Sequence, residues 1–235
     1  MTSITVQRAN QRFNTDFGWL HSQHSFNFGP HYSPDNKGFG LLLVNNDDVV
    51  EAGAGFGTHP HRDMEIVTWV LSGQLEHRDS EGNHGVLYPG LAQRMSAGRG
   101  IQHSEMNASK DEPVHLVQMW VHPDTVGVQP GYEQKDINAD LAAGGLVAIA
   151  SGQGHPSAVK IHQAGAVLWG ARLAAGEFVP LPVDPHVHVF VALGAGEVDL
   201  VGHLDQGDAA RLTLAGPATF TASSHATELL VWATS

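Results

Sequence analysis

The chain of 235 residues contains no cysteine. Without a thiol there is no disulfide framework, no thiolate zinc site and no cysteine nucleophile. Basic residues are also scarce: 12 lysines and arginines stand against 24 aspartates and glutamates, which gives a net charge of −12. Because a nucleic-acid surface needs clustered basic side chains, we expect no direct binding of DNA or RNA.

Long apolar runs and targeting signals are missing as well. No stretch approaches the roughly 18 apolar residues needed to cross a bilayer. The opening residues MTSITVQRANQRF lack the apolar core of a signal peptide. We therefore expect a cytoplasmic protein without a membrane partner, and a monomer by default.

Short apolar segments separated by glycine turns make up most of what is present. The segments rich in β-branched or aromatic residues are MEIVTWVL (64–71), VHLVQMWV (114–121), LVAIA (146–150), AVLWG (166–170), VHVFVAL (187–193), EVDLV (197–201), ARLTL (210–214) and ELLVWA (228–233). Such segments are typical of strands, and only DINADLAAGG is expected to form a turn or two of helix. The pattern predicts an all-β fold of sandwiches or barrels.

A polar stretch with two prolines, HPDTVGVQPGYEQKD (122–136), is typical of a linker. It predicts two domains, 1–130 and 131–235, each long enough for one small β-barrel.

Sixteen histidines are present, and two short motifs place some of them for metal binding. In GFGTHPHRDME, His59 and His61 are two residues apart, so both side chains face the same side of an extended strand. In GRGIQHSEMN, the same parity holds for His103 and Glu105. Facing strands would then supply three nitrogens and one carboxylate oxygen, a set that suits Fe(II), Mn, Co, Ni, Cu or Zn.

Glu65 has two alternative roles. It follows His61 by four residues, about 13 Å along an extended strand, so it could bind the same metal only if the strand bends. It either orients a ligand histidine through a hydrogen bond or makes a purely structural hydrogen bond. The histidines in polar or glycine-rich stretches are expected to be exposed or simply hydrogen-bonded: His21, His24, His31, His77, His84 and His155.

The C-terminal half offers His186 and His188 with matching parity. A distal partner is missing, because His225 and Glu228 are three apart and face opposite sides of a strand. We therefore interpret this pair as two histidines on a strand face.

The two motifs resemble the two cupin motifs, and THPHRDMEIVTWVLSG with MSAGRGIQHSEMN resembles the pirin family, in particular its bacterial quercetin 2,3-dioxygenase-like members. The resemblance is strong to about residue 135. It implies a bicupin, two β-barrels packed face to face, with one metal in the first barrel and none in the second. It assigns His59, His61, His103 and Glu105 as ligands, with Fe(II) as the expected metal.

The resemblance also implies a reaction. A flavonol such as quercetin would be opened by dioxygen with loss of carbon monoxide, and Glu105 would be both metal ligand and catalytic base. An alternative role known in the family is a redox-sensitive regulator that binds a protein partner without catalysis.

Overall fold

The computed structural model describes residues 1–235, and nearly all of its regular structure is β-strand. The strands, in chain order, are β1 (Ser3–Gln7), β2 (Phe13–Asp16), β3 (Leu20–His24), β4 (Leu42–Val50), β5 (Gly55–His61), β6 (Glu65–Ser72), β7 (Leu75–Asp79), β8 (His84–Leu87), β9 (Leu91–Ser96), β10 (Ile101–Asn107), β11 (Val114–Val121), β12 (Gly131–Asp136), β13 (Val147–Ser151), β14 (Val159–Lys160), β15 (Ala166–Leu173), β16 (Phe178–Pro180), β17 (His186–Leu193), β18 (Ala195–Val198), β19 (Gly202–Asp205), β20 (Ala209–Thr213), β21 (Thr219–Ala222) and β22 (Thr227–Thr234). The helices are η1 (Ala9–Gln11) and α1 (Asn138–Ala142). Neither has the length or apolar character that crossing a membrane requires.

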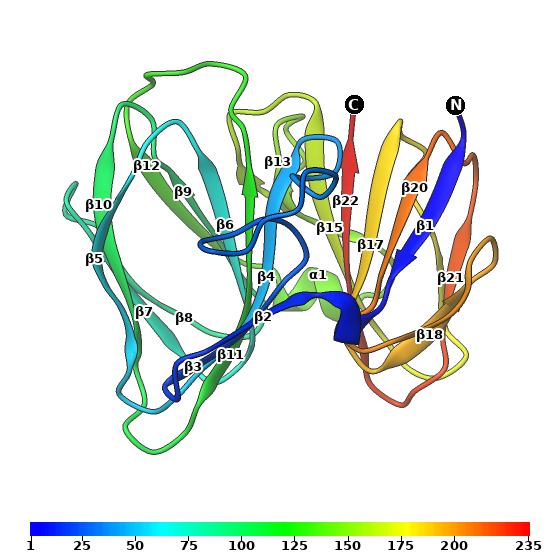
Figure 1. Ribbon diagram of the computed structural model, residues 1–235, viewed down its shortest axis with the longest axis horizontal. Helices are drawn as coiled ribbons and strands as arrows, with labels where there is room; N and C mark the ends of the chain where they lie inside the picture. The colour runs from blue at the N-terminus through cyan, green and yellow to red at the C-terminus, as the bar shows by residue number, and fades with distance from the viewer.

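These strands form two lobes that lie side by side (Figure 1). The first lobe joins the seven-stranded sheet β12-β9-β6-β11-β4-β3-β2 to the four-stranded sheet β5-β10-β7-β8. The second joins β1-β20-β17-β22-β15-β13-β14 to β16-β21-β18-β19. Each lobe is therefore a large and a small sheet closed around an interior, which is the all-β, two-barrel architecture that the sequence predicts.

Alternation along β6 explains how the lobes join. Val67 and Trp69 belong to a buried cluster of 23 residues that also contains Leu230 and Trp232 from β22 of the other lobe. The intervening side chains of β6 point into the first barrel instead. Both faces of this strand are thus covered, which accounts for its continuous apolar sequence.

The interiors of the two barrels differ in polarity. The second barrel encloses a cluster of 16 buried apolar residues. In the first, two smaller clusters of 7 and 4 buried residues leave room between them. Polar side chains occupy that room, and they form the site described below.

Two of the expected elements differ from the structure. The segment expected as a strand at 197–201 is a strand only at 195–198, because residues 199–201 form the turn into β19. The stretch expected as a linker, 122–136, ends in β12, which pairs antiparallel with β9. Its half-exposed residues mark an edge strand, so it lacks the apolar alternation that identifies an interior strand.

The course of the chain between the lobes bears on the domain division. β1, the first strand of the chain, pairs with β20 in the second lobe, while β12 pairs within the first. We keep a division near residue 130 as a proposal, with the qualification that these two strands lie across it.

Candidate metal centre

Two adjacent strands of the small sheet bring three histidines together in the first barrel. β5 and β10 are antiparallel, with His59 directly opposite His103. The ring centroids of His59 and His103 are 4.4 Å apart, and each lies 4.9 Å from that of His61. The three imidazoles therefore lie together, although the two strands are neighbours in one sheet and not facing strands as expected. That the three histidines are metal ligands stays a prediction.

The ring nitrogens are arranged to bind an ion. Nε2 of His61 and Nε2 of His103 are buried without any hydrogen-bond partner. Nδ1 of His59 lies 2.8 Å from the carbonyl oxygen of Gly57, to which it donates, so Nε2 carries the free lone pair. Buried nitrogens left unpaired are costly unless a ligand or ion satisfies them, so the residues fit a bound transition metal.

Burial keeps the imidazoles of His61 and His103 neutral. It lowers the pKa of His61 to about 4, and the neighbouring histidines add to the shift. It lowers the pKa of His103 to about 3, with His59 and His77 contributing. Neutral imidazole is the form that binds metal, so the site is ready for an ion near pH 7.

Glu105 lies close to this group but is held by other side chains. The pairing of β10 with β5 shifts register between His103 and Glu105. The carboxylate accepts hydrogen bonds from Gln118 Nε2 at 2.7 Å and from Thr68 Oγ1 at 3.3 Å. Two sets of residues have potential metal-ligand atoms within 4.8 Å of one another. One set is His59, His61 and His103. The other is His77, His103 and Glu105, so Glu105 is near His103 but is not in the set that contains His59 and His61. The four-residue ligand set stays a prediction.

His77 is a residue that sequence reasoning assigned no role at the site. It is fully buried on β7, with Nε2 at 3.2 Å from Asp79 Oδ2 and Nδ1 at 3.5 Å from His103 Nδ1. If Nε2 carries the proton given to Asp79, Nδ1 accepts from His103 and leaves Nε2 of His103 free. Orienting a ligand histidine in this way is common in metal sites.

Glu65 does not contact any of the clustered histidines. Its Oε2 accepts hydrogen bonds from Ser96 Oγ at 2.7 Å and from the backbone N–H of His162 at 3.0 Å. His162 belongs to the second half of the chain, so Glu65 joins the two lobes. Of its two alternative roles, the structural hydrogen bond is the one the geometry shows.

A cavity of about 400 Å³ opens beside the histidines. Five Phe and Trp side chains form part of its wall, a feature suited to planar ligands. The aromatic residues that line it are Phe17, Trp19, Phe28, Phe56 and Trp120. The polar residues that line it are Thr15, Ser22, His24, Asn46, Asp48, His59, His61, Glu105 and Gln118.

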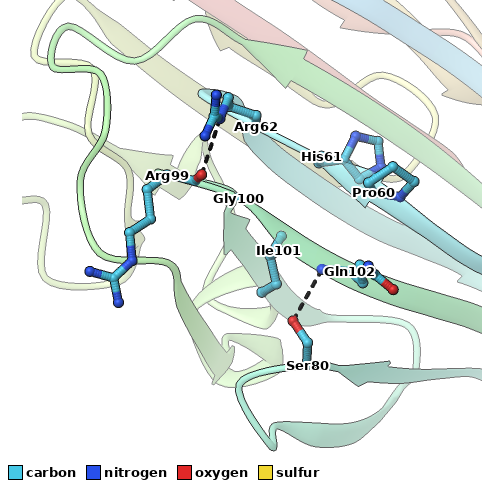
Figure 2. A pocket seen from close by; sticks show the side chains of 8 residues that line it. All are labelled: Pro60, His61, Arg62, Ser80, Arg99, Gly100, Ile101 and Gln102. Atoms are coloured by element: carbon cyan, nitrogen blue, oxygen red, sulfur yellow. Dashed lines mark hydrogen bonds between the residues drawn. The ribbon is translucent and has the colours of Figure 1, made fainter.

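His61 also borders a second hollow of about 490 Å³ (Figure 2). This one is open and polar, with Arg62 and Arg99 at its rim. Arg62 Nε donates to the backbone carbonyl of Arg99 at 3.1 Å. Only the first cavity combines His61 with His59 and Glu105, so it is the candidate ligand site.

The histidines of the second barrel lie elsewhere. His188 is buried, and its ring lies 5.8 Å from that of Phe26 and 6.4 Å from that of Phe39, at the junction of the lobes. His186 contacts Phe39 edge-on at 5.4 Å. The pair thus lies on the outer face of β17 against the first lobe.

Two cupin barrels, one of them lined by a histidine cluster beside an aromatic cavity, define a bicupin. Family comparison agrees with this class: the pirin model matches residues 5–121, and the quercetinase C-terminal cupin domain model matches residues 148–232. The chain belongs to the pirin family.

Individual relatives span the chain. A Mycobacterium tuberculosis (strain H37Rv) protein named "Putative quercetin 2,3-dioxygenase Rv0181c" is 54% identical over 98% of this chain and 94% of its own. An Escherichia coli K12 protein named "Quercetin 2,3-dioxygenase" is 47% identical over 68% of each chain. The crystal structure of the Escherichia coli pirin YhhW in complex with nickel(II) matches with a TM-score of 0.90, at 36% identity over 99% of each chain.

Proposed function

We propose that this protein is a metal-dependent dioxygenase that opens the heterocycle of a flavonol with release of carbon monoxide. The observation that carries the proposal is the cluster of His59, His61 and His103, two of which, His59 and His61, line a cavity of about 400 Å³ with aromatic side chains in its wall. The relatives named as quercetin 2,3-dioxygenases support the substrate class.

The three histidines and Glu105 would hold one divalent transition metal. A bound metal would supply Lewis-acid and redox chemistry toward a phenolic oxygen and dioxygen. Fe(II) is the expected metal, and nickel is what the YhhW crystal structure contains. Imidazole ligands discriminate poorly among Fe, Mn, Co, Ni, Cu and Zn. The activity assay therefore compares protein loaded with each of these metals.

Glu105 would take the proton of the substrate hydroxyl. Its carboxylate is buried, and it is positioned by Gln118 and Thr68. A carboxylate held within reach of the reacting hydroxyl is a suitable general base.

The walls of the cavity would bind and orient the flavonol. Trp120 lies edge-on to His61, with 4.9 Å between ring centroids, and Phe28 lies edge-on to Trp120 at 5.5 Å. Flat apolar side chains of this kind contact the rings of a flavonol and keep water from them.

Turnover of quercetin tests the proposal. Protein purified without oxygen and loaded separately with each metal is mixed with quercetin and air, and loss of quercetin absorbance and release of carbon monoxide are followed. We expect turnover with at least one metal and its loss in His103→Ala, while the exposed His84→Ala serves as control. Absence of turnover with every metal would overturn the proposal and favour the regulatory role.

Glu105→Gln tests the base separately. The amide keeps the size of the side chain but is a poor proton acceptor. We expect kcat to fall by about 10²-fold or more while quercetin still binds. Full activity with the metal retained would remove Glu105 as the base.

A further inference from the structure

Asp48 is a second buried carboxyl in the same cavity, and the proposed reaction does not use it. It lies on β4, is 4% exposed, and lines the cavity together with His59, His61 and Glu105. No lysine, arginine or histidine pairs with it, and its Oδ1 accepts a hydrogen bond from Ser22 Oγ. Oδ2 is therefore left for a ligand in the cavity.

Burial makes Asp48 able to exchange a proton near neutral pH. It raises the pKa of this carboxyl to about 7 and outweighs the hydrogen bond from Ser22, which lowers it. The charged or titratable groups around Asp48 are Asp47 beside it on β4, Glu105 from β10 and Arg12 from the segment before β2. The two carboxylates raise its pKa further, and Arg12 opposes them.

A line of hydrogen bonds leads away from Asp48 along the large sheet. Ser22 and His24 lie two residues apart on β3, with Ser22 Oγ at 3.3 Å from His24 Nδ1. His24 Nε2 is 3.0 Å from Thr15 Oγ1 on β2. Thr15 Oγ1 is in turn 2.9 Å from His31 Nε2.

Exposure changes along this line. Ser22 and His24 are buried, with 2% and 3% of their surface accessible, whereas Thr15 and His31 are partly exposed. The line therefore runs along the cavity wall, which Asp48, Ser22, His24 and Thr15 all line, and it ends outside the cavity at His31, where water can reach the imidazole. His24 faces Arg12 and His31, and burial is the largest cause of its lowered pKa, so it is neutral near pH 7.

The donors and acceptors can point consistently in either direction. When Asp48 is ionised, Ser22 donates to it, the Nδ1–H of His24 donates to Ser22, and Thr15 donates to Nε2 of His24. When Asp48 is protonated, every bond reverses and His24 carries its proton on Nε2. The protonation of Asp48 is thus linked to the tautomer of His24.

We propose that five side chains form a proton relay between the cavity and the protein surface. In order from the cavity they are Asp48, Ser22, His24, Thr15 and His31. The relay would act in the proposed dioxygenase reaction. That the ligand is a polyphenol rests on this proposed function. It serves a hydroxyl of that ligand other than the one that Glu105 faces.

The step moves one proton and no electrons. The O–H bond of a ligand hydroxyl breaks, and its proton goes to Oδ2 of Asp48. Rotation of the protonated carboxyl then turns this proton toward Ser22 Oγ, the first acceptor of the line. Reversal of the hydrogen bonds passes a proton along the line, and His31 releases one to water. The ligand is left as a phenolate, and Asp48 returns to its ionised form.

Nitrogen NMR of the ring of His24 tests the relay in metal-free protein, since ¹⁵N shifts distinguish the two tautomers. In wild type we expect Nδ1–H above pH 7 and Nε2–H below it, with one midpoint near the pKa of Asp48. Asp48→Asn and Ser22→Ala should each abolish the switch. A tautomer that ignores pH in wild type, or that still switches in Asp48→Asn, would overturn the relay.

Thr15 offers a matched pair of variants for the outer half. Thr15→Val removes the hydroxyl and should leave the tautomer switch at His24 while abolishing the matching tautomer change at His31, which ¹⁵N shifts of the His31 ring report. Thr15→Ser should restore the change at His31. If His31 still responds in Thr15→Val, the proposed route is wrong.

Activity provides a second, separable readout. If the holoenzyme turns quercetin over, Asp48→Asn should lower kcat by about 10²-fold, Thr15→Val should slow it, and Thr15→Ser should recover it. If no metal supports turnover but the tautomer switch is present, the relay stands and the proposed dioxygenase function fails. Unchanged kcat in Asp48→Asn would remove the relay from the reaction.

Discussion

At the scale of single residues, the spacing within each motif predicts which side chains share a face of a strand, and the pairing of β5 with β10 brings His59, His61 and His103 together. Parity on a strand is a local property, so it can be read from a sequence. His77 and Asp48 could not be found in this way, because their role depends on which distant strands share one interior. A signal did exist for Asp48: the run NNDD interrupts the apolar strand LLLVNNDDVV.

His77 carries a prediction of its own. His77→Phe keeps a ring against Tyr132, whose centroid lies 4.6 Å away, but removes the acceptor for Nδ1 of His103. We expect metal affinity to fall by about 10- to 100-fold, as for other residues that orient a ligand. Competition with a chromophoric chelator measures it.

His84 is the matched control for that measurement. It lies in the next strand of the same hairpin and is exposed, bonded to Glu76 rather than to the cluster. His84→Phe should leave metal affinity unchanged. Equal affinities in all three proteins would mean that His103 needs no orienting partner.

At the scale of the elements, strands with mostly apolar segments were predicted, whereas the more polar interior strands β4 and β9 and the edge strand β12 were not. β6, β11 and β22 are covered on both faces, and their mostly apolar sequences reflect that burial. β12 lies at an edge and consists of polar residues, so its sequence is not distinguishable from that of a loop. Hydrophobic pattern reports burial and only indirectly reports hydrogen bonding.

The turn that leads into β10 yields a prediction at this scale. Gly98 has φ +46°, and a Cβ there would overlap the backbone carbonyl of Val128. Gly98→Ala should therefore lower the free energy of unfolding by about 1–3 kcal/mol. Urea denaturation measures this change.

Gly57 provides the comparison for Gly98. Its backbone is not in the left-handed region, and a Cβ there would meet no atom within 4 Å. Gly57→Ala should leave stability nearly unchanged. If both variants unfold at the same urea concentration, the turn tolerates the clash and the argument for Gly98 is wrong.

At the scale of the whole molecule, the largest apolar cluster lies between the barrels. It has 23 buried residues, compared with 16 inside the second barrel. The sequence indicated two barrels but not that the largest apolar cluster joins them. The sequence of a single strand does not show which lobe its second face will contact.

The shared cluster predicts cooperative unfolding. Separating the lobes would expose Trp69 and Trp232, which are each 1% exposed in the folded protein. We expect one calorimetric transition with equal calorimetric and van't Hoff enthalpies. Two resolved transitions would show that the barrels are independently stable.

Buried histidines predict a loss of stability in acid. Burial lowers the pKa of His61 to about 4 and those of His103 and His188 to about 3, whereas an unfolded imidazole titrates near about 6.5. Between these values the unfolded chain binds more protons, so the stability of chelator-treated protein should fall as pH drops from about 6.5.

Asp48 acts in the opposite direction. Its pKa is raised to about 7, so the folded state binds the extra proton and this group alone favours folding as pH falls. The three histidines together lower the stability in acid by more than Asp48 raises it. Asp48→Asn removes the opposing contribution, so the free energy of unfolding should fall more steeply as the pH drops. Urea midpoints at pH 7, 6 and 5 test both statements, and midpoints that rise toward pH 5 would contradict them.

The pairing of β1 with β20 has a consequence for the order of assembly. During synthesis the first strand emerges from the ribosome some 200 residues before its neighbour, Ala209–Thr213. β1 therefore has no pairing partner while the first lobe is synthesised. A bulky fusion placed directly before Ser3 should hinder the final closure of the second lobe more than the same fusion attached after Ser235.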